Sequence, residues 1–168
     1  PDDPTHPVSV YGRTKRDGEQ AVLDNCRSGV IVRTAWLYSS HGNNFVKTMQ
    51  RLGMEKESIG VVADQVGSPT WAADLATAIV KIIPQINESN RGIYHYTNAG
   101  VCSWYDLAVA VMDILNLKCH VHPITTAQYP TPAVRPAYSV LDKTKIIETF
   151  NVDIPHWEAS LRRCLKQH

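Results

Sequence analysis

The sequence predicts an α/β fold in which the strands of a mostly parallel sheet alternate with helices. Short runs of β-branched and apolar residues recur along the chain, and segments with the apolar period of a helix follow them. Of the 168 residues, 43% are hydrophobic and 20% are charged, as in an ordinary globular domain. At this length we expect residues 1–168 to form a single globular unit.

Charge and composition exclude several classes of function. The net charge is +1 without a basic stripe, so we expect neither nucleic acid nor a membrane as partner. Apolar runs such as 29–32 are far shorter than the ~20 residues of a spanning helix, and no secretory signal opens the chain. The cysteines Cys26, Cys102, Cys119 and Cys164 are scattered, which indicates reduced thiols and a cytoplasmic protein.

The first third of the chain predicts four elements. Pro-rich residues 1–7 lead into a helix over 8–26, and residues 29–38 contain an apolar run that is typical of a strand buried on both faces. Turn residues at 41–44 precede a helix over 45–52 that we expect to end at Gly53, and residues 59–63 form a short strand.

The next helix begins where Thr70 is predicted to be its N-cap and Asp74 lies in its first turn. We expect its apolar face to contain Leu75, Ile79, Ile82 and Ile83. A strand over 93–97 follows, and it ends at the turn formed by 98–100.

Ser103 and Asp106 have the spacing of a capping box. An apolar stripe follows the box and predicts a further helix, made up of Leu107, Val111, Ile114 and Leu115. Asp142 is expected to cap a short helix, and 157–165 form the last one. The Pro-rich stretch 123–136 predicts a long ordered loop, and such loops are often functional.

Tyr11 and Lys15 are the first residues with recognisable chemistry. Their spacing of four places both side chains on one helix face. A ketone reductase needs an acid that protonates the developing alkoxide, and a nearby ammonium lowers the pKa of a phenol from its usual value of about 10. A lysine there can also hold the ribose hydroxyls of a nicotinamide cofactor. The spacing is common by chance, however, and Lys15 could instead pair with Glu19.

The longer segment 3–15 resembles the active-site segment of extended short-chain dehydrogenases, in which a Pro-rich strand exit leads into a Tyr-x-x-x-Lys helix. Four further segments resemble one branch of that family, the dTDP-4-dehydrorhamnose reductases: 33–38, 41–49, 64–70 and 135–142. The similarity covers essentially the whole chain in the right order. It implies the C-terminal portion of a Rossmann-like enzyme, with the small substrate-binding region and without the dinucleotide-binding half.

The resemblance implies a reaction and its participants. Tyr11 would be the general acid, and Lys15 would be its electrostatic partner; both would contact NADPH or NADH. The reaction would reduce the 4-keto group of dTDP-4-dehydro-L-rhamnose to give dTDP-L-rhamnose. The family is also associated with Mg²⁺, but the sequence shows no constellation of metal ligands.

Four other residues are interpreted as contacts to the dTDP-sugar. Trp36 just after a strand is a candidate wall against the sugar or nicotinamide, because ligands bind at strand carboxyl ends, although it could belong to the core. Asn43 and Asn44 suit sugar hydroxyls or phosphate oxygens but could be simple turn residues. Arg135 in a Pro-stiffened loop fits a diphosphate clamp, or it is a surface charge.

Several alternatives stay open. One is another nucleotide-sugar epimerase or reductase, and another is a non-catalytic regulatory subunit with a reductase-like fold. A metal-binding module would rest on His120 and His122 alone. Because no Gly-x-x-Gly-x-x-Gly phosphate loop occurs in the sequence, we expect the isolated chain not to turn over. We also expect its first strand to expose an edge that allows a homodimer to form.

Overall fold

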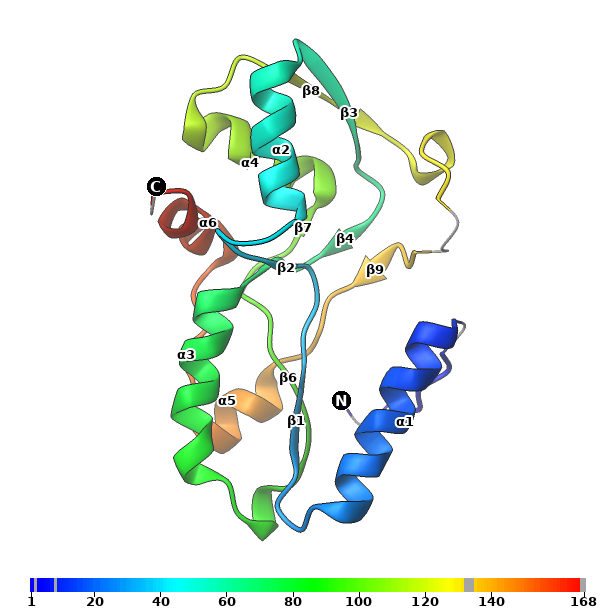
Figure 1. The fold of residues 1–168 in the computed structure, drawn as a ribbon, viewed down its shortest axis with the longest axis vertical. Coiled ribbons are helices and arrows are strands. Elements are labelled where there is room, and N and C mark those ends of the chain that lie inside the picture. Colours follow the sequence, from blue (N-terminus) through cyan, green and yellow to red (C-terminus); the bar gives the residue numbers. More distant parts are fainter. Residues whose placement is uncertain (2, 8, 132–134, 167–168) are drawn as a thin grey trace.

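The computed structural model describes residues 1, 3–7, 9–131 and 135–166. The molecule is elongated, and two groups of elements follow one another along its long axis (Figure 1). Each group has its own cluster of buried apolar side chains. The α/β class that the sequence predicts is confirmed, with strands and helices alternating along most of the chain.

The first group surrounds a parallel pair of strands. β1 (Val30–Arg33) pairs with β6 (Gly92–His95) over their full length. The helices α3 (Ala72–Ile82) and α5 (Thr144–Phe150) contribute Ile82, Ile146 and Phe150 to its buried cluster. α1 (Val10–Asn25) lies on the other side of β1 from α3 (Figure 1), and none of its residues is buried.

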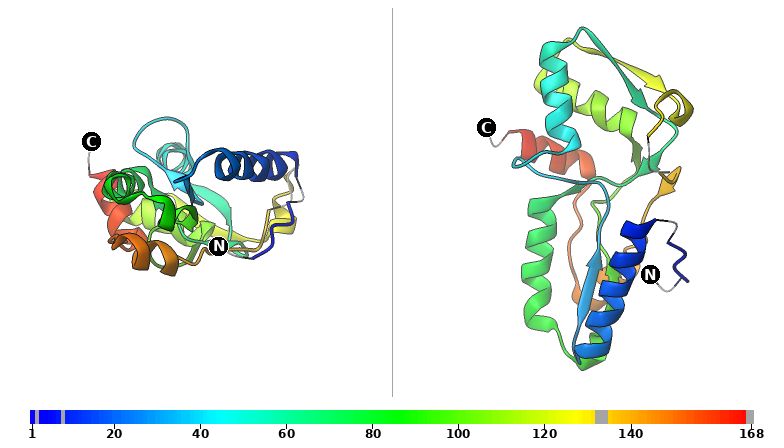
Figure 2. Two further views of the ribbon diagram at one scale, coloured as in Figure 1. Left: turned by 90° about the horizontal axis from the view of Figure 1, so that it is seen from below. Right: turned by 45° about the vertical axis from the view of Figure 1, so that its right-hand side comes forward.

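The second group contains a second parallel pair, β3 (Ser58–Val62) with β8 (His120–Ile124). The helices α2 (Phe45–Glu55), α4 (Trp104–Leu115) and α6 (Trp157–Leu165) complete its core. Figure 2 shows α2 and α4 side by side next to this strand pair. The prediction that α2 ends at Gly53 is wrong: a Cβ at Gly53 would lie 2.6 Å from Sδ of Met112, so the glycine permits a close approach to α4.

Short strands connect the two groups. β2 (Leu37–Tyr38) pairs with β5 (Thr70–Trp71) in parallel. β4 (Val66–Gly67) lies between β7 (Cys102–Ser103), which is antiparallel to it, and β9 (Tyr138–Ser139), which is parallel. Short 3-10 segments lie in the connections: Ile83–Gln85, Glu88–Asn90 and Thr126–Gln128.

A buried carboxylate fixes the junction between the groups. Asp74 on α3 accepts hydrogen bonds from Asn98 Nδ2 (2.7 Å) and from the Ser160 hydroxyl, and it forms an ion pair with Arg163 Nη2 (2.8 Å). Asn98 Oδ1 in turn accepts from the backbone N–H of Trp71 (2.8 Å). Asp74 is therefore more than the first-turn acid that the sequence predicts, because it ties α3 to α6 and to the turn after β6.

Three sequence predictions need correction. The strand expected over 29–38 is interrupted over 34–36, and the residues of β1 are only partly buried; the second edge of β1 has no partner strand among the described residues. Thr70 does not cap α3; it lies in β5, and its hydroxyl donates to the carbonyl of Ala35 (2.8 Å). Ile79 on α3 and Ile83 directly after it are exposed, since Leu75, Ala78 and Ile82 form the packed face.

Other predictions are confirmed. The hydroxyl of Ser103 accepts from the N–H of Asp106 (3.0 Å), and the carboxylate of Asp106 accepts from the N–H of Ser103 (2.8 Å). The last helix has the predicted bounds.

The prediction that Asp142 caps the short helix is off by one residue: Lys143 is the N-cap of α5 and makes no side-chain capping bond, while the carboxylate of Asp142 accepts from the N–H of Thr144 (2.9 Å). Val8, the predicted helix start, and 132–134 of the long loop lie outside the described residues.

All four cysteines are free thiols, of which Cys26 alone is exposed. Within the part of the chain that the structure describes, no helix has the length and apolar character needed to cross a membrane.

Candidate active site

Tyr11 and Lys15 lie together on the first turns of α1. Ser9 caps the helix, since its hydroxyl accepts from the N–H of Gly12 (3.0 Å). The ammonium nitrogen of Lys15 lies 5.5 Å from the centroid of the Tyr11 ring, within the range of a cation–π contact. Tyr11 is 72% exposed, so its phenol is open to a ligand. The predicted shared face is thus present, while the catalytic roles remain a prediction.

The competing pairing of Lys15 with Glu19 does not form. The two carboxylate oxygens of Glu19 accept from Nε (2.7 Å) and Nη2 (2.6 Å) of Arg33 at the end of β1. This bidentate contact raises the pKa of Arg33 through hydrogen bonding and the charge of Glu19, against the opposing effect of burial. The ion pair holds α1 against β1 and leaves Lys15 beside Tyr11.

Trp36 has an unusual backbone conformation for a bulky residue, with φ at 49°. Such a conformation costs roughly 1–3 kcal/mol and persists only where the surroundings enforce it. Its ring stacks on Trp104, with centroids 3.6 Å apart and planes inclined by 10°. One face of the Trp36 indole is therefore covered by Trp104, so at most the other face could contact a ligand.

The two asparagines differ in their contacts. Asn44 is the N-cap of α2: its Oδ1 accepts from the N–H of Lys47 (3.1 Å), and its Nδ2 donates to the carbonyl of Ser39 (2.8 Å). Both ends of its amide therefore support the loop and the helix. Asn43 is exposed in the preceding turn. The predicted ligand role of Asn44 competes with this structural role, and that of Asn43 stays a prediction.

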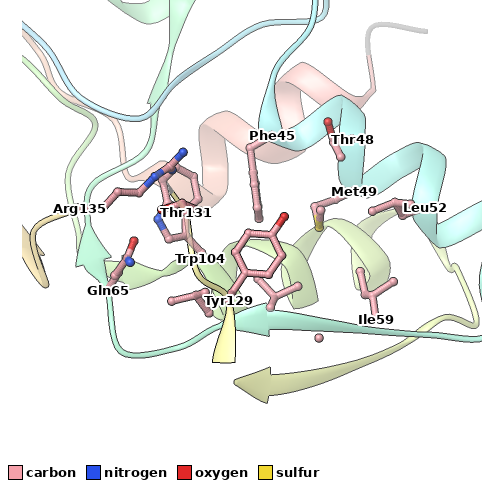
Figure 3. A pocket seen from close by; sticks show the side chains of 13 residues that line it. Phe45, Thr48, Met49, Leu52, Ile59, Gln65, Trp104, Tyr129, Thr131 and Arg135 are labelled. Carbon is pink, nitrogen blue, oxygen red and sulfur yellow. The ribbon is translucent and has the colours of Figure 1, made fainter. Parts of the chain in front are cut away.

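A pocket of about 420 Å³ lies between α2, β3 and the loop after β8, and its volume is in the range of small-molecule sites. Met49, Leu52 and Ile59 line one end, whereas Gln65, Thr131 and Arg135 gather at the other (Figure 3). The ring of Tyr129 extends between the two ends, opposite Phe45 (Figure 3). One pocket thus offers an apolar compartment and a polar, positively charged one.

The polar end is supported by a loop contact. Asp64 accepts from the backbone N–H of Thr126 (2.9 Å) and from its hydroxyl (2.7 Å). The same hydroxyl accepts from Nε2 of Gln65 (3.0 Å). These bonds from Thr126 hold the pKa of Asp64 below its usual range. They fix the loop that carries Tyr129 against the strand end that carries Gln65.

Of the six predicted site residues, only Arg135 lines this pocket. Sequence reasoning missed Phe45, Gln65, Trp104 and Tyr129, although two of them lie inside segments that carry the resemblance. Phe45 belongs to the 41–49 segment, and Gln65 belongs to 64–70. Trp104 and Tyr129 lie outside those segments. Tyr129 belongs to the Pro-rich stretch 123–136 that was expected to be a functional loop, whereas no sequence signal pointed to Trp104.

The histidines of β8 do not form a metal site of the usual kind. The rings of His120 and His122 are 4.5 Å apart between centroids and meet edge to face. Within the described ranges, no group of three or more His, Cys, Asp or Glu side chains is arranged to hold a metal ion. The structure therefore offers no support for the metal-module alternative or for a resident Mg²⁺.

Comparison with known proteins gives a consistent result. The family model described as RmlD substrate binding domain matches residues 1–168. The chain is 42% identical over 166 residues to a dTDP-4-dehydrorhamnose reductase of Aggregatibacter actinomycetemcomitans, with 94% of this chain and 56% of that protein covered. It is 46% identical over 162 residues to a probable dTDP-4,6-dihydroxy-2-methyloxan-3-one 4-ketoreductase of Streptomyces antibioticus, with 96% and 54% covered.

A solved structure shows the same fold. The dTDP-4-dehydrorhamnose reductase of Bacillus anthracis, in complex with NADP, superposes with a TM-score of 0.92 at 41% identity. That alignment covers 99% of this chain and 58% of the other. The chain thus spans a little over half the length of the relatives that it matches.

Proposed function

Because the chain belongs to the RmlD substrate-binding domain family, we propose that it forms the nucleotide-sugar side of a reductase acting on a dTDP-4-keto-sugar. The reaction is the NAD(P)H-dependent reduction of dTDP-4-dehydro-L-rhamnose to dTDP-L-rhamnose. The two-compartment pocket is the observation that carries this proposal. Its apolar end suits a pyrimidine base, and Arg135 at the other end suits a diphosphate.

Tyr11 and Lys15 supply the proton side of the reaction in this proposal. The phenol donates its proton to the ketone oxygen while C4 receives a hydride, which the bound nicotinamide cofactor supplies. The ammonium of Lys15, on the same helix face, stabilises the phenolate that remains. Its exposed position also lets it hydrogen-bond a cofactor ribose. In this proposal Trp36, which follows β1, packs against the sugar.

The sequence contains no Gly-x-x-Gly-x-x-Gly loop that could receive a cofactor pyrophosphate. We therefore expect this chain alone to bind dTDP-sugars without oxidising NADPH. NADPH absorbance in the presence of the ketosugar is the readout, and measurable ketosugar-dependent oxidation by the chain would refute this part of the proposal.

The sugar itself is a separate question. The relative from Streptomyces antibioticus has a different dTDP-4-keto-sugar in its name and the higher identity of the two. A reductase for another 4-keto-sugar is thus a second candidate with a specific observation behind it. The ketosugar in that name lacks the C2 hydroxyl of 4-dehydrorhamnose, so the affinities for dTDP-L-rhamnose and for its 2-deoxy counterpart separate the two candidates.

Isothermal titration calorimetry with dTDP tests the proposal directly. We expect dTDP to bind to one site and uncharged thymidine to bind more weakly, since Arg135 contacts only the diphosphate. ADP is the matched control for charge without the pyrimidine. The absence of dTDP binding, or equal affinity for ADP, would contradict the assignment. A non-catalytic subunit would also bind dTDP. If the chain were such a subunit, Tyr11→Phe would leave NADPH oxidation by the enzyme that contains it unchanged.

A further inference from the structure

Trp36 differs from the other residues that have a positive φ. Besides glycines, Asn116 and Asn151 also adopt this conformation, with φ of 52° and 48°, and each follows the last turn of a helix. Asparagine tolerates that position well, whereas tryptophan does not. The surroundings of Trp36 must therefore enforce its conformation.

The main chain of Trp36 is held by β5. The N–H of Thr70 donates to the carbonyl of Trp36 (3.1 Å), and the hydroxyl of Thr70 donates to that of Ala35 (2.8 Å). Thr70 is fully buried, so both bonds are protected from water. These contacts fix the peptide groups on either side of the Trp36 Cα, but they leave the direction of the indole undetermined.

Two neighbours determine where the indole lies. Gly67 provides the space, because a Cβ there would lie 2.6 Å from Cε2 of Trp36. Trp104 covers one ring face in the nearly parallel stack described above. Trp104 is itself held at the start of α4, between Ser103 and Asp106 of the capping box. The stack thus places the Trp36 ring relative to a rigid helix terminus.

Trp104 also belongs to the pocket. It lines the cavity toward the end where Arg135 and Thr131 lie (Figure 3). Its ring lies 4.7 Å from that of Phe45, with the planes inclined by 50°. Trp36 is not among the residues that line the cavity, but its ring stacks on that of Trp104. A nucleotide-sugar with its base at the apolar end and its diphosphate at Arg135 therefore directs its sugar toward the Trp36 side.

We propose that Trp104 is a positioning residue for the sugar: its indole holds the Trp36 ring in place beside the Arg135 end of the pocket, and Trp36 then packs against the sugar of the bound nucleotide. This inference rests on the proposed function. It goes further because it assigns to Trp104, which belongs to the nucleotide pocket, a role in binding the adjoining sugar.

Trp104 is expected to change the affinity that the sugar adds to dTDP, so binding is measured for two ligands, one without the sugar and one with it. The dissociation constants of dTDP and of dTDP-L-rhamnose are measured by calorimetry on the full chain. The dissociation constant of dTDP divided by that of dTDP-L-rhamnose isolates the sugar contact from the base and diphosphate contacts. We expect Trp104→Leu to lower this ratio by roughly threefold to tenfold, the range expected for loss of one stacked aromatic contact. Trp104→Phe keeps a ring that can stack and should restore part of the ratio.

A double-mutant cycle separates positioning from a direct contact. If Trp104 acts through Trp36, the variant Trp36→Leu lowers the ratio as well, and the double variant lowers it little further. Tyr105→Leu removes an aromatic ring from the same helix turn without altering the pocket lining, and it should leave the ratio unchanged. Thermal unfolding of each variant checks that it is folded.

The outcomes are distinguishable. If the wild-type chain does not bind dTDP, the proposed function fails and this inference fails with it. If both ligands bind but Trp104→Leu weakens them equally, Trp104 is only a wall of the nucleotide pocket and the inference is overturned. The same conclusion follows from a wild-type ratio of one, or from additive effects in the double variant.

Discussion

The helices α1 and α4 begin with the same kind of cap but differ in how far they are buried. Each has a serine cap whose hydroxyl accepts a backbone N–H three residues later. α4 buries four residues of its 12, whereas α1 buries none of its 16. The proposed nucleotide pocket is therefore built on a packed core, while the Tyr–Lys pair lies on a helix held mainly at one face by the Glu19–Arg33 ion pair. The two halves of the proposed site differ in how much of this chain's own structure supports them.

The largest expected effect is the difference in the free energy of unfolding between truncations on α4 and on α1. Leu107 on α4 is 1% exposed, and Val10 on α1 is 67% exposed. We expect Leu107→Ala to lower the free energy of unfolding by about 2–5 kcal/mol through a lost transfer contribution and a cavity. Val10→Ala should change it by less than about 0.5 kcal/mol. Urea unfolding followed by circular dichroism measures both, and equal losses would contradict the comparison.

The junction is the next place where the comparison can be tested. Asp74→Ala removes the acceptor shared by Asn98, Ser160 and Arg163. We expect the free energy of unfolding to fall by about 1–3 kcal/mol, because buried donors are left without partners. Glu158→Ala is the control, since its pair with Arg162 is exposed and should contribute less than about 1 kcal/mol. A similar loss in both variants would show that the buried network is not what holds the junction.

A variant at Arg135 tests whether the polar end of the pocket binds the diphosphate. Arg135→Ala should weaken dTDP binding roughly tenfold, as expected for a lost charged hydrogen bond, and should leave thymidine binding unchanged. Arg51→Ala on α2 removes the same charge from an exposed pair with Glu55 outside the pocket lining. Calorimetry at two salt concentrations distinguishes the two variants, since only the loss of a contact at the pocket should weaken the binding of dTDP without changing the binding of thymidine. An equal effect of the two variants would indicate a general charge effect.

The smallest expected effect concerns pH and lies at the end of β6. Burial lowers the pKa of His95, with further contributions from the N-terminal amine and Arg33, and Asp142 opposes them. Neither ring nitrogen has a hydrogen-bond partner among the described residues. The unfolded state therefore binds more protons than the folded state near pH 6.5, so stability falls as the pH decreases below about 6.5.

Unfolding of the wild type and of His95→Gln, compared between about pH 8 and about pH 5, checks this sign. The variant should lose less stability on acidification than the wild type does. Identical profiles would mean that His95 is not the group responsible. The remaining histidines are unchanged in the comparison.

Local signals in the sequence predicted local structure well. The Ser103–Asp106 box and the last helix depend on residues a few positions apart, and both are confirmed. The break at Trp36 was missed because it depends on Thr70, Gly67 and Trp104, which are distant in sequence. Gly53 was misinterpreted for the same reason, since its use is a contact with α4 rather than a helix end.

The candidate site shows the same division. The geometry of Tyr11 and Lys15 followed from their spacing on one helix. The pocket did not, because residues from α2, from the end of β3 and from the loop after β8 meet only in the folded chain. Asn44 shows the limit of residue type alone: its amide is a plausible ligand by chemistry, and the structure uses it as a helix cap.

Hydrogen exchange with and without dTDP compares the two regions directly. We expect dTDP to slow amide exchange around 45–65 and 126–131, which contain residues that line the pocket, and to leave exchange in α1 unchanged. Protection confined to α1, or no protection anywhere in the chain, would contradict the claim that the nucleotide binds to the packed group of elements.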